Sequence, residues 1–178
     1  MRTAGRVYSF VNANSKALKF LALFAAIFAI TYFIFGIAPG VRRGLVQPYT
    51  VFLADAVAAV LNLFGEGART DGATVISSRF SISIAMGCDG VEPMCLFMAG
   101  VLAYPASWRA RLVGLALGVP VIHLINLARL IMLYYAGVMM PSVIDEIHVY
   151  VAQTIVILLS TAILIFWLDR FAVKPGRT

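Results

Sequence analysis

The chain has 178 residues, of which 62% are hydrophobic and only 12% are charged, and its mean hydropathy is +0.94. A chain of this size cannot hide so much apolar surface in a water-soluble core, so the composition excludes a soluble globular protein and indicates an integral membrane protein. The net charge of +6 does not indicate nucleic-acid binding, because the basic residues flank apolar runs and form no cluster with interleaved aromatic residues.

The first apolar run covers residues 17–38 and is rich in Phe, Leu, Ile and Ala. It follows a basic stretch, residues 1–16, which we expect to be a cytoplasmic tail. At a rise of about 1.5 Å per residue the run can cross a hydrocarbon core about 30 Å thick. No A-x-A cleavage site precedes Pro39, so we expect a retained transmembrane helix rather than a signal peptide.

The second apolar segment, residues 45–64, fits two placements. It contains Asp55, and a charged Asp at the centre of a span costs about 3 kcal/mol on insertion scales. Its bulky residues recur at helical spacing, which also fits a helix lying on the membrane surface. We therefore expect a surface or partly inserted helix, with a full crossing as the alternative.

Residues 65–86 are rich in Gly, Thr, Ser and Asp, and their alternating pattern over 73–85 predicts a short extended segment or hairpin outside the bilayer. Three further transmembrane helices are predicted at 89–105, 112–135 and 149–168. The predicted fold class is thus an all-α integral membrane protein, with about four transmembrane helices in a single domain over residues 1–178. A second basic tail is expected at 169–178.

Orientation follows from the positive-inside rule. With both termini and the loop 105–111 on one side, nine basic residues lie there against one acid, Asp169. The other side receives seven of the eight acids. This topology requires the segment 45–64 not to cross, and it predicts that both termini are cytoplasmic.

The stretch Gly87-Cys88-Asp89-Gly90 places a thiol and a carboxylate between two glycines at the start of the second predicted span. The positive end of a helix dipole favours a thiolate there, which makes Cys88 a candidate nucleophile. Cys95 lies within the apolar run and is expected to be inert core packing. A disulfide between the two is not expected at this spacing, and no CxxC metal pair is present.

The topology brings Cys88, Arg129 and His148 toward one membrane face. Cys88 heads the second predicted span and His148 heads the fourth, while Arg129 lies about 9 Å below the outer end of the third. An arginine at that depth is costly unless it is paired or lines a wet cavity. Asn126, one turn away on the same face, can hold the guanidinium by hydrogen bonding, whereas His123 is expected to be structural.

Cys, His and Arg form a sufficient set for acyl transfer: the thiolate attacks a carbonyl, the His moves protons and the Arg stabilises the thiolate or the oxyanion. The simpler alternatives are that Arg129 snorkels to the interface and that His148 caps the last helix. A non-enzymatic membrane subunit for assembly or transport, with Arg129, Asp55 and His123 along a polar path, is the competing function. A Cys/His metal site lacks a third or fourth ligand.

These residues resemble the exosortase/archaeosortase family of membrane cysteine transpeptidases. The resemblance covers roughly residues 17–168, and the short length is similar to the compact exosortase H type. Its specific part consists of Gly87-Cys88-Asp89-Gly90 opening a helix, Asn126-Leu127-Ala128-Arg129 within the next span, and His148 heading the last one.

The resemblance implies that Cys88 is the nucleophile, Arg129 the electrostatic stabiliser and His148 the general acid/base, without a cofactor. It implies exported substrate proteins whose C-terminal sorting signal combines a short motif, a transmembrane helix and a basic tail. The new C-terminus would pass to an acceptor nucleophile at the extracytoplasmic face of a bacterial inner membrane. Family members commonly have Ser or Ala after the Cys; Asp89 here disfavours a thiolate unless Arg129 offsets it. Asp89 is expected either to orient His148 or to pair with Arg129.

Overall fold

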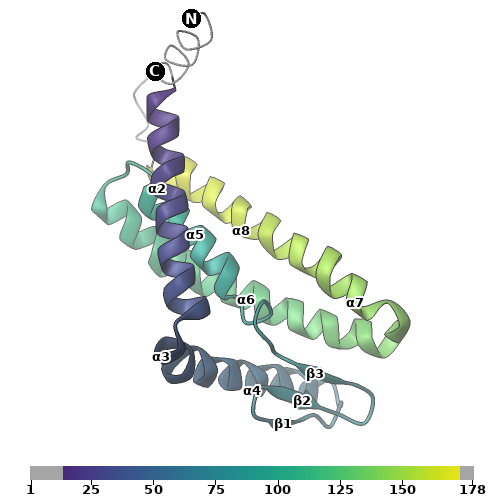
Figure 1. Cartoon of the computed structure of the whole chain (residues 1–178). Helices are drawn as coiled ribbons and strands as arrows, with labels where there is room; N and C mark the ends of the chain where they lie inside the picture. Colours follow the sequence, from purple (N-terminus) through teal and green to yellow (C-terminus); the bar gives the residue numbers. More distant parts are fainter. Residues whose placement is uncertain (1–13, 173–178) are drawn as a thin grey trace, which may run out of the picture.

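The computed structural model describes residues 14–172, which form a mostly helical protein with one small sheet (Figure 1). The predicted basic tails therefore lie largely outside the described residues. The longer helices are α2 (Ser15–Tyr32), α4 (Gln47–Leu63), α5 (Val91–Ala103), α6 (Trp108–Met139) and α8 (Gln153–Trp167). Short helical turns extend them: η1 (Phe33–Ile37), α3 (Pro39–Val41), η2 (Arg42–Val46), η3 (Pro141–Val143), α7 (Ile144–Glu146), η4 (Ile147–Ala152) and η5 (Leu168–Ala172).

Four helical stretches in the described range are long and apolar enough to cross a membrane, which confirms the predicted class of helical membrane protein. They are Ser15–Ile37, Pro39–Leu63, Trp108–Met139 and Pro141–Ala172. The predicted span 89–105 is instead the shorter helix α5, of 13 residues. It starts after Gly90, whose φ of 80° is left-handed, and ends where Tyr104 turns extended before Pro105.

The last two spans are longer than predicted. Helix α6 continues to Met139, and the next helical stretch begins at Pro141. Residues 142–148, which precede the predicted span 149–168, are helical in the structure. Pro141 is suited to the first helical position, and Asp145 and Glu146 lie near the positive end of the helix dipole.

Helix α4 and the sheet occupy one end of the molecule, with α4 running across the end of α2 (Figure 1). The stretch Pro39–Leu63, which contains α4, is long and apolar enough to cross a membrane, so the surface placement expected from the sequence stays a prediction. The first turn of α2 and the last turn of α8 lie toward the opposite end (Figure 1). Helix α4 buries Leu53, Val57 and Leu61 against residues of the sheet and of α6.

The sheet confirms the predicted extended segment. Strands β2 (Thr74–Ile76) and β3 (Ser81–Ser83) pair antiparallel, and an unpredicted strand, β1 (Arg69–Asp71), adds to the other edge of β2. Val75 at the centre of β2 is fully buried in the cluster that α4 and α6 also form. The outer strand β3 leads directly toward Cys88.

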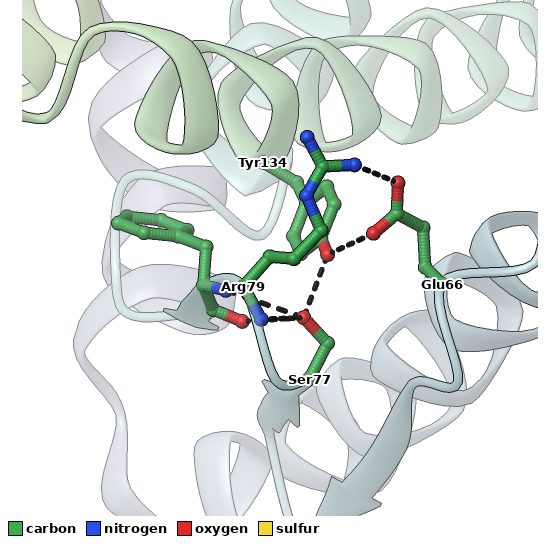
Figure 2. Close-up of polar contacts among 5 residues, drawn as sticks. Glu66, Ser77, Arg79 and Tyr134 are labelled. Atoms are coloured by element: carbon green, nitrogen blue, oxygen red, sulfur yellow. Dashed lines mark hydrogen bonds and ion pairs between the residues drawn. The ribbon is translucent and has the colours of Figure 1, made fainter.

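A polar network fastens the sheet to α6 (Figure 2). The hydroxyl of Tyr134 donates to Glu66 Oε2 at 2.8 Å, and Arg79 Nη1 donates to Glu66 Oε1 at 2.8 Å. The Ser77 hydroxyl lies 2.6 Å from that of Tyr134. The segment before β1 and the turn between β2 and β3 are thereby held on the helix that carries Asn126 and Arg129.

Helix α5 packs against α2, α6 and α8. Its contact with α6 depends on Gly118, because a Cβ there would collide with the ring of Phe97. At the end of α8, Trp167 Nε1 donates to the carbonyl of Ala110 on α6 at 2.8 Å. These close contacts fix the three elements between which the candidate site lies.

Candidate functional site

The structure brings together four of the residues singled out from the sequence. Cys88 lies in the loop between β3 and α5, Asn126 and Arg129 lie on α6, and His148 lies in η4. The first three are buried, with exposed fractions of 3%, 0% and 5%, and His148 is half-buried. A π-helical turn such as η4 is frequent at functional sites because it redirects one side chain from a regular helix.

Cys88 and His148 are in direct polar contact. Sγ lies 3.1 Å from Nε2 and 3.8 Å from Nδ1. The first distance is within reach for proton transfer between a nucleophile and its base. His148 does not stand at the head of its helix, because the helical stretch begins seven residues earlier at Pro141. The side chain therefore faces the thiol from within the helix rather than capping it.

Arg129 lies deeper and is better held than the sequence indicated. It stands ten residues before Met139, so about 15 Å from the end of α6. Its Nη1 donates to the carbonyl of Gly87 at 3.2 Å, and its Nη2 lies 3.9 Å from Cys88 Sγ. Arg129 Nε is buried and has no hydrogen-bond partner in the described part of the chain. The guanidinium is directed at the thiol loop, which argues against snorkelling to the interface.

Asn126 contacts both the loop that carries Cys88 and the guanidinium of Arg129. Its Nδ2 donates to the carbonyl of Cys88 at 2.8 Å, and its Oδ1 accepts from Arg129 Nη1 at 3.4 Å. A Cβ on Gly90 would lie 3.2 Å from the Asn126 amide carbon, so the left-handed glycine also allows this close approach. The amide therefore holds the backbone of the nucleophile loop against α6, in addition to its expected contact with the guanidinium.

Asp89 makes neither of its two expected contacts within residues 14–172. Its Oδ1 accepts from the backbone N–H of Val91 at 3.1 Å, an Asx turn that starts α5. The carboxyl is 2% exposed, and this burial raises its pKa, while the hydrogen bond from Val91 and the charge of Arg42 act in the opposite direction. The side chain of Asp89 thus stabilises the loop at the start of α5 and does not contact His148 or Arg129 directly.

Burial and two neighbouring charges act on the pKa of the Cys88 thiol. Burial raises the pKa of Cys88, the positive charge of Arg129 lowers it, and the charge of Asp89 raises it again. The net direction is upward, which favours the neutral thiol over the thiolate. Such a thiol needs a base to become nucleophilic, and His148 is in position for it.

The other singled-out residues have packing partners elsewhere. Cys95 is fully buried in an apolar cluster with Val46 and Val91. His123 Nδ1 lies 2.8 Å from the hydroxyl of Tyr49, which links α6 to α4. Among the described residues, no group of three or more His, Cys, Asp or Glu side chains could hold a metal ion.

Sequence reasoning missed two parts of the surroundings. The carbonyl of Gly87 accepts from Arg129, and a backbone acceptor leaves no signal in the sequence. Glu92, in the first turn of α5, accepts from Gln153 Nε2 at 3.2 Å and from the hydroxyl of Tyr32 at 3.5 Å. An acid and an amide within apolar runs were the available signals for that cluster.

A multi-helix membrane protein in which a thiol, an imidazole and a guanidinium meet beside a small sheet is the class that the fold and site define. The sequence profile of the transmembrane exosortases (Exosortase_EpsH) matches residues 14–167. The chain belongs to this family, which confirms the resemblance. No curated protein matches the chain, and no solved structure does. Membership implies a multi-pass membrane protein that processes sorting signals on substrate proteins, and it suggests a transpeptidase.

Proposed function

We propose that this chain is a cysteine transpeptidase, of the compact exosortase H type, that forms a thioester with its substrate on Cys88. The observation that carries the proposal is the 3.1 Å contact between Cys88 Sγ and His148 Nε2, with Arg129 Nη2 3.9 Å from the same sulfur. Nucleophile, base and cation are thus within reach of one reacting carbonyl.

The first half-reaction breaks the peptide bond. His148, neutral with its proton on Nδ1, accepts the thiol proton at Nε2 as Sγ attacks the scissile carbonyl. Arg129 stabilises the negative charge on sulfur and then on the carbonyl oxygen, a contribution of about 10²–10³ in rate for one such donor. The C–N bond breaks, the proton passes from His148 to the leaving amine, and the acyl group remains on Cys88 as a thioester.

The second half-reaction releases the product. An acceptor nucleophile gives its proton to His148 and attacks the thioester carbonyl. The C–S bond breaks, the new C-terminus is joined to the acceptor, and the proton returns to Cys88. Water as acceptor would make the same site a peptidase.

The proposed substrates are exported proteins whose C-terminal signal contains a short motif, an apolar span and a basic tail. Such a span holds the substrate in the same bilayer, so the scissile bond needs to reach only the level of Cys88. With both termini cytoplasmic, the site faces the extracytoplasmic side of a bacterial inner membrane.

The alternative, a non-enzymatic subunit with a continuous polar path, is less well supported. Asp55 accepts from the Thr70 hydroxyl at 2.7 Å on the sheet side, and His123 pairs with Tyr49. These side chains have separate local partners and do not join Arg129.

The test is processing of a signal-bearing protein encoded beside this chain, followed as an electrophoretic mobility shift. Cys88→Ala abolishes the shift, whereas Cys95→Ala, the matched loss of a buried thiol, retains it. Both variants are checked for equal amounts in the membrane fraction. Normal processing by Cys88→Ala contradicts the proposal, and equal loss in both variants indicates a structural role for the thiols.

A further inference from the structure

A cavity of about 460 Å³ lies between the η2–α4 region and the segment that joins β3 to α5. Its polar lining is supplied by Arg42, Arg43, Gln47, Thr50 and Asp89. The rest of the wall includes Ala85 and Met86, which follow the outer strand β3. Asp89 acts on the thiol only through its charge, and the other residues take no part in the chemistry proposed above.

The cavity wall carries more positive than negative charge. Arg42 and Arg43 face a single acid, Asp89, which belongs to the Asx turn. Neither arginine has a carboxylate within ion-pair distance in residues 14–172, where the salt bridge found is Arg79–Glu66. Arg42 Nη1 donates to the carbonyl of Gly36 at 2.8 Å, which fixes one guanidinium in place. A cation held in this way suits an anionic group of a ligand, and Arg43 is exposed beside it.

The cavity adjoins the nucleophile in the chain. Asp89 directly follows Cys88, and consecutive Cα atoms are about 3.8 Å apart. An extended peptide advances about 3.3 Å per residue, so a side chain within a few residues of a bond held at Cys88 can reach this cavity. The cavity wall also includes Ile84, which directly follows the edge strand β3, and the edge of a sheet is a backbone surface that commonly accepts an extended peptide.

We infer that this cavity binds the substrate segment on the amino-terminal side of the cleaved bond, and that Arg42 and Arg43 select a carboxylate side chain in it. The inference rests on the proposed function. In the substrate, the apolar span lies on the carboxyl-terminal side of the cleaved bond and within the bilayer. The substrate residues on the amino-terminal side of that bond therefore lie on the side of α4 and the sheet. Charge-assisted and bidentate contacts to arginine favour a carboxylate over its neutral amide by about tenfold or more.

The experiment uses the purified full chain in detergent and a set of acetylated tetrapeptide vinyl sulfones, which alkylate an active thiol. Each peptide carries one Glu in a background of Ala, moved through the four positions, and is compared with the Gln peptide of the same position. The rate of labelling at Cys88 is measured by mass spectrometry. The variants are Arg42→Gln/Arg43→Gln, Arg43→Gln alone, and Arg69→Gln as a control that removes an equal charge from β1.

The expected result is one position at which Glu labels at least tenfold faster than Gln in the unmodified chain and in Arg69→Gln. The preference falls in Arg43→Gln and approaches unity in the double variant, while the Gln peptides label all four proteins at similar rates. That last comparison also shows that the variants are folded.

Equal labelling by the Glu and Gln peptides overturns the inference and leaves the proposed function standing. A Glu preference that persists in the double variant also overturns it. Equal labelling of the unmodified chain by the Glu and Gln peptides, together with its tighter binding than that of the double variant to phosphatidylglycerol nanodiscs, assigns the cavity to a lipid headgroup instead. Failure of every peptide to label Cys88 counts against the proposed function and removes the inference with it.

Discussion

Cys88 Sγ lies 3.1 Å from His148 Nε2, although the two residues are 60 positions apart in the chain. Neither belongs to α6, yet α6 sets the position of the loop that carries Cys88. Asn126 binds the carbonyl of Cys88 and Arg129 binds that of Gly87. The contact between thiol and imidazole is therefore assembled by three elements, and each can be perturbed separately.

His148→Gln is expected to lower processing by about 10²–10⁴, the usual contribution of a positioned general acid/base. Gln retains a polar side chain of similar length but cannot exchange the proton. The single-turnover rate on a signal-bearing substrate measures the effect. His123→Gln serves as the control: it loses the Tyr49 contact and thermal stability, and it keeps its rate per folded molecule. Equal rate losses in both variants would assign His148 a structural role.

Arg129→Gln is expected to raise the pKa of Cys88, because it removes the positive charge that stabilises the thiolate. The rate of iodoacetamide alkylation rises with the thiolate fraction, so the variant needs a higher pH to reach half of its maximal rate. The measurement is made in a Cys95→Ser background, with Arg69→Gln as the charge control. An unchanged or lower midpoint would show that the guanidinium does not act on the thiol.

Asp89→Asn is expected to act in the opposite direction. The neutral amide keeps an oxygen that accepts from the N–H of Val91, while the charge that raises the pKa of Cys88 is lost. The midpoint of the alkylation profile moves to lower pH, and alkylation at pH 7 becomes faster than in the unmodified chain. Slower alkylation with retained folding would mean that the carboxylate assists the thiol rather than opposing it.

The helical part of the fold could be predicted from sequence because long apolar runs and flanking charges are local features. The alternation over 73–85 also identified β2 and β3. Strand β1 was missed because Arg69–Asp71 contains no apolar alternation, and its place is set by pairing with β2. The network of Glu66 with Tyr134 joins residues 68 positions apart, a proximity that depends on packing.

The candidate site could also be predicted only in part from the sequence. The topology from the positive-inside rule predicted Cys88, Arg129 and His148 near one membrane face, because the position of each residue along its predicted span can be counted from the sequence. The hydrogen bond from the Asn126 side-chain amide to the Cys88 carbonyl and the Asx turn of Asp89 were beyond sequence reasoning. Both depend on how the loop bends at Gly87 and Gly90, where φ is 88° and 80°.

Gly90→Ala is expected to lower activity, because Ala costs about 1–2 kcal/mol at a left-handed position and its Cβ would lie 3.2 Å from the Asn126 amide carbon. The amide is pushed away from the carbonyl of Cys88, and the thiol moves relative to His148. Gly65→Ala is the matched control, since its φ is also 80° and nothing lies within 4 Å of the added Cβ. Thermal stability falls in both variants, and the processing rate per folded molecule falls in Gly90→Ala. Equal rates would show that the Asn126 contact does not position the thiol.

The central claim is that the acyl group of the substrate is carried by Cys88. The most direct test is to incubate the unmodified chain briefly with a signal-bearing substrate, quench in acid, and determine the mass of the proteolytic fragment that contains Cys88. We expect an adduct equal in mass to the substrate's new C-terminal peptide, attached at Cys88, removed by hydroxylamine and missing in His148→Gln at the same time point. Cleavage of the substrate without any adduct at Cys88, or with the adduct at Cys95, would contradict the central claim.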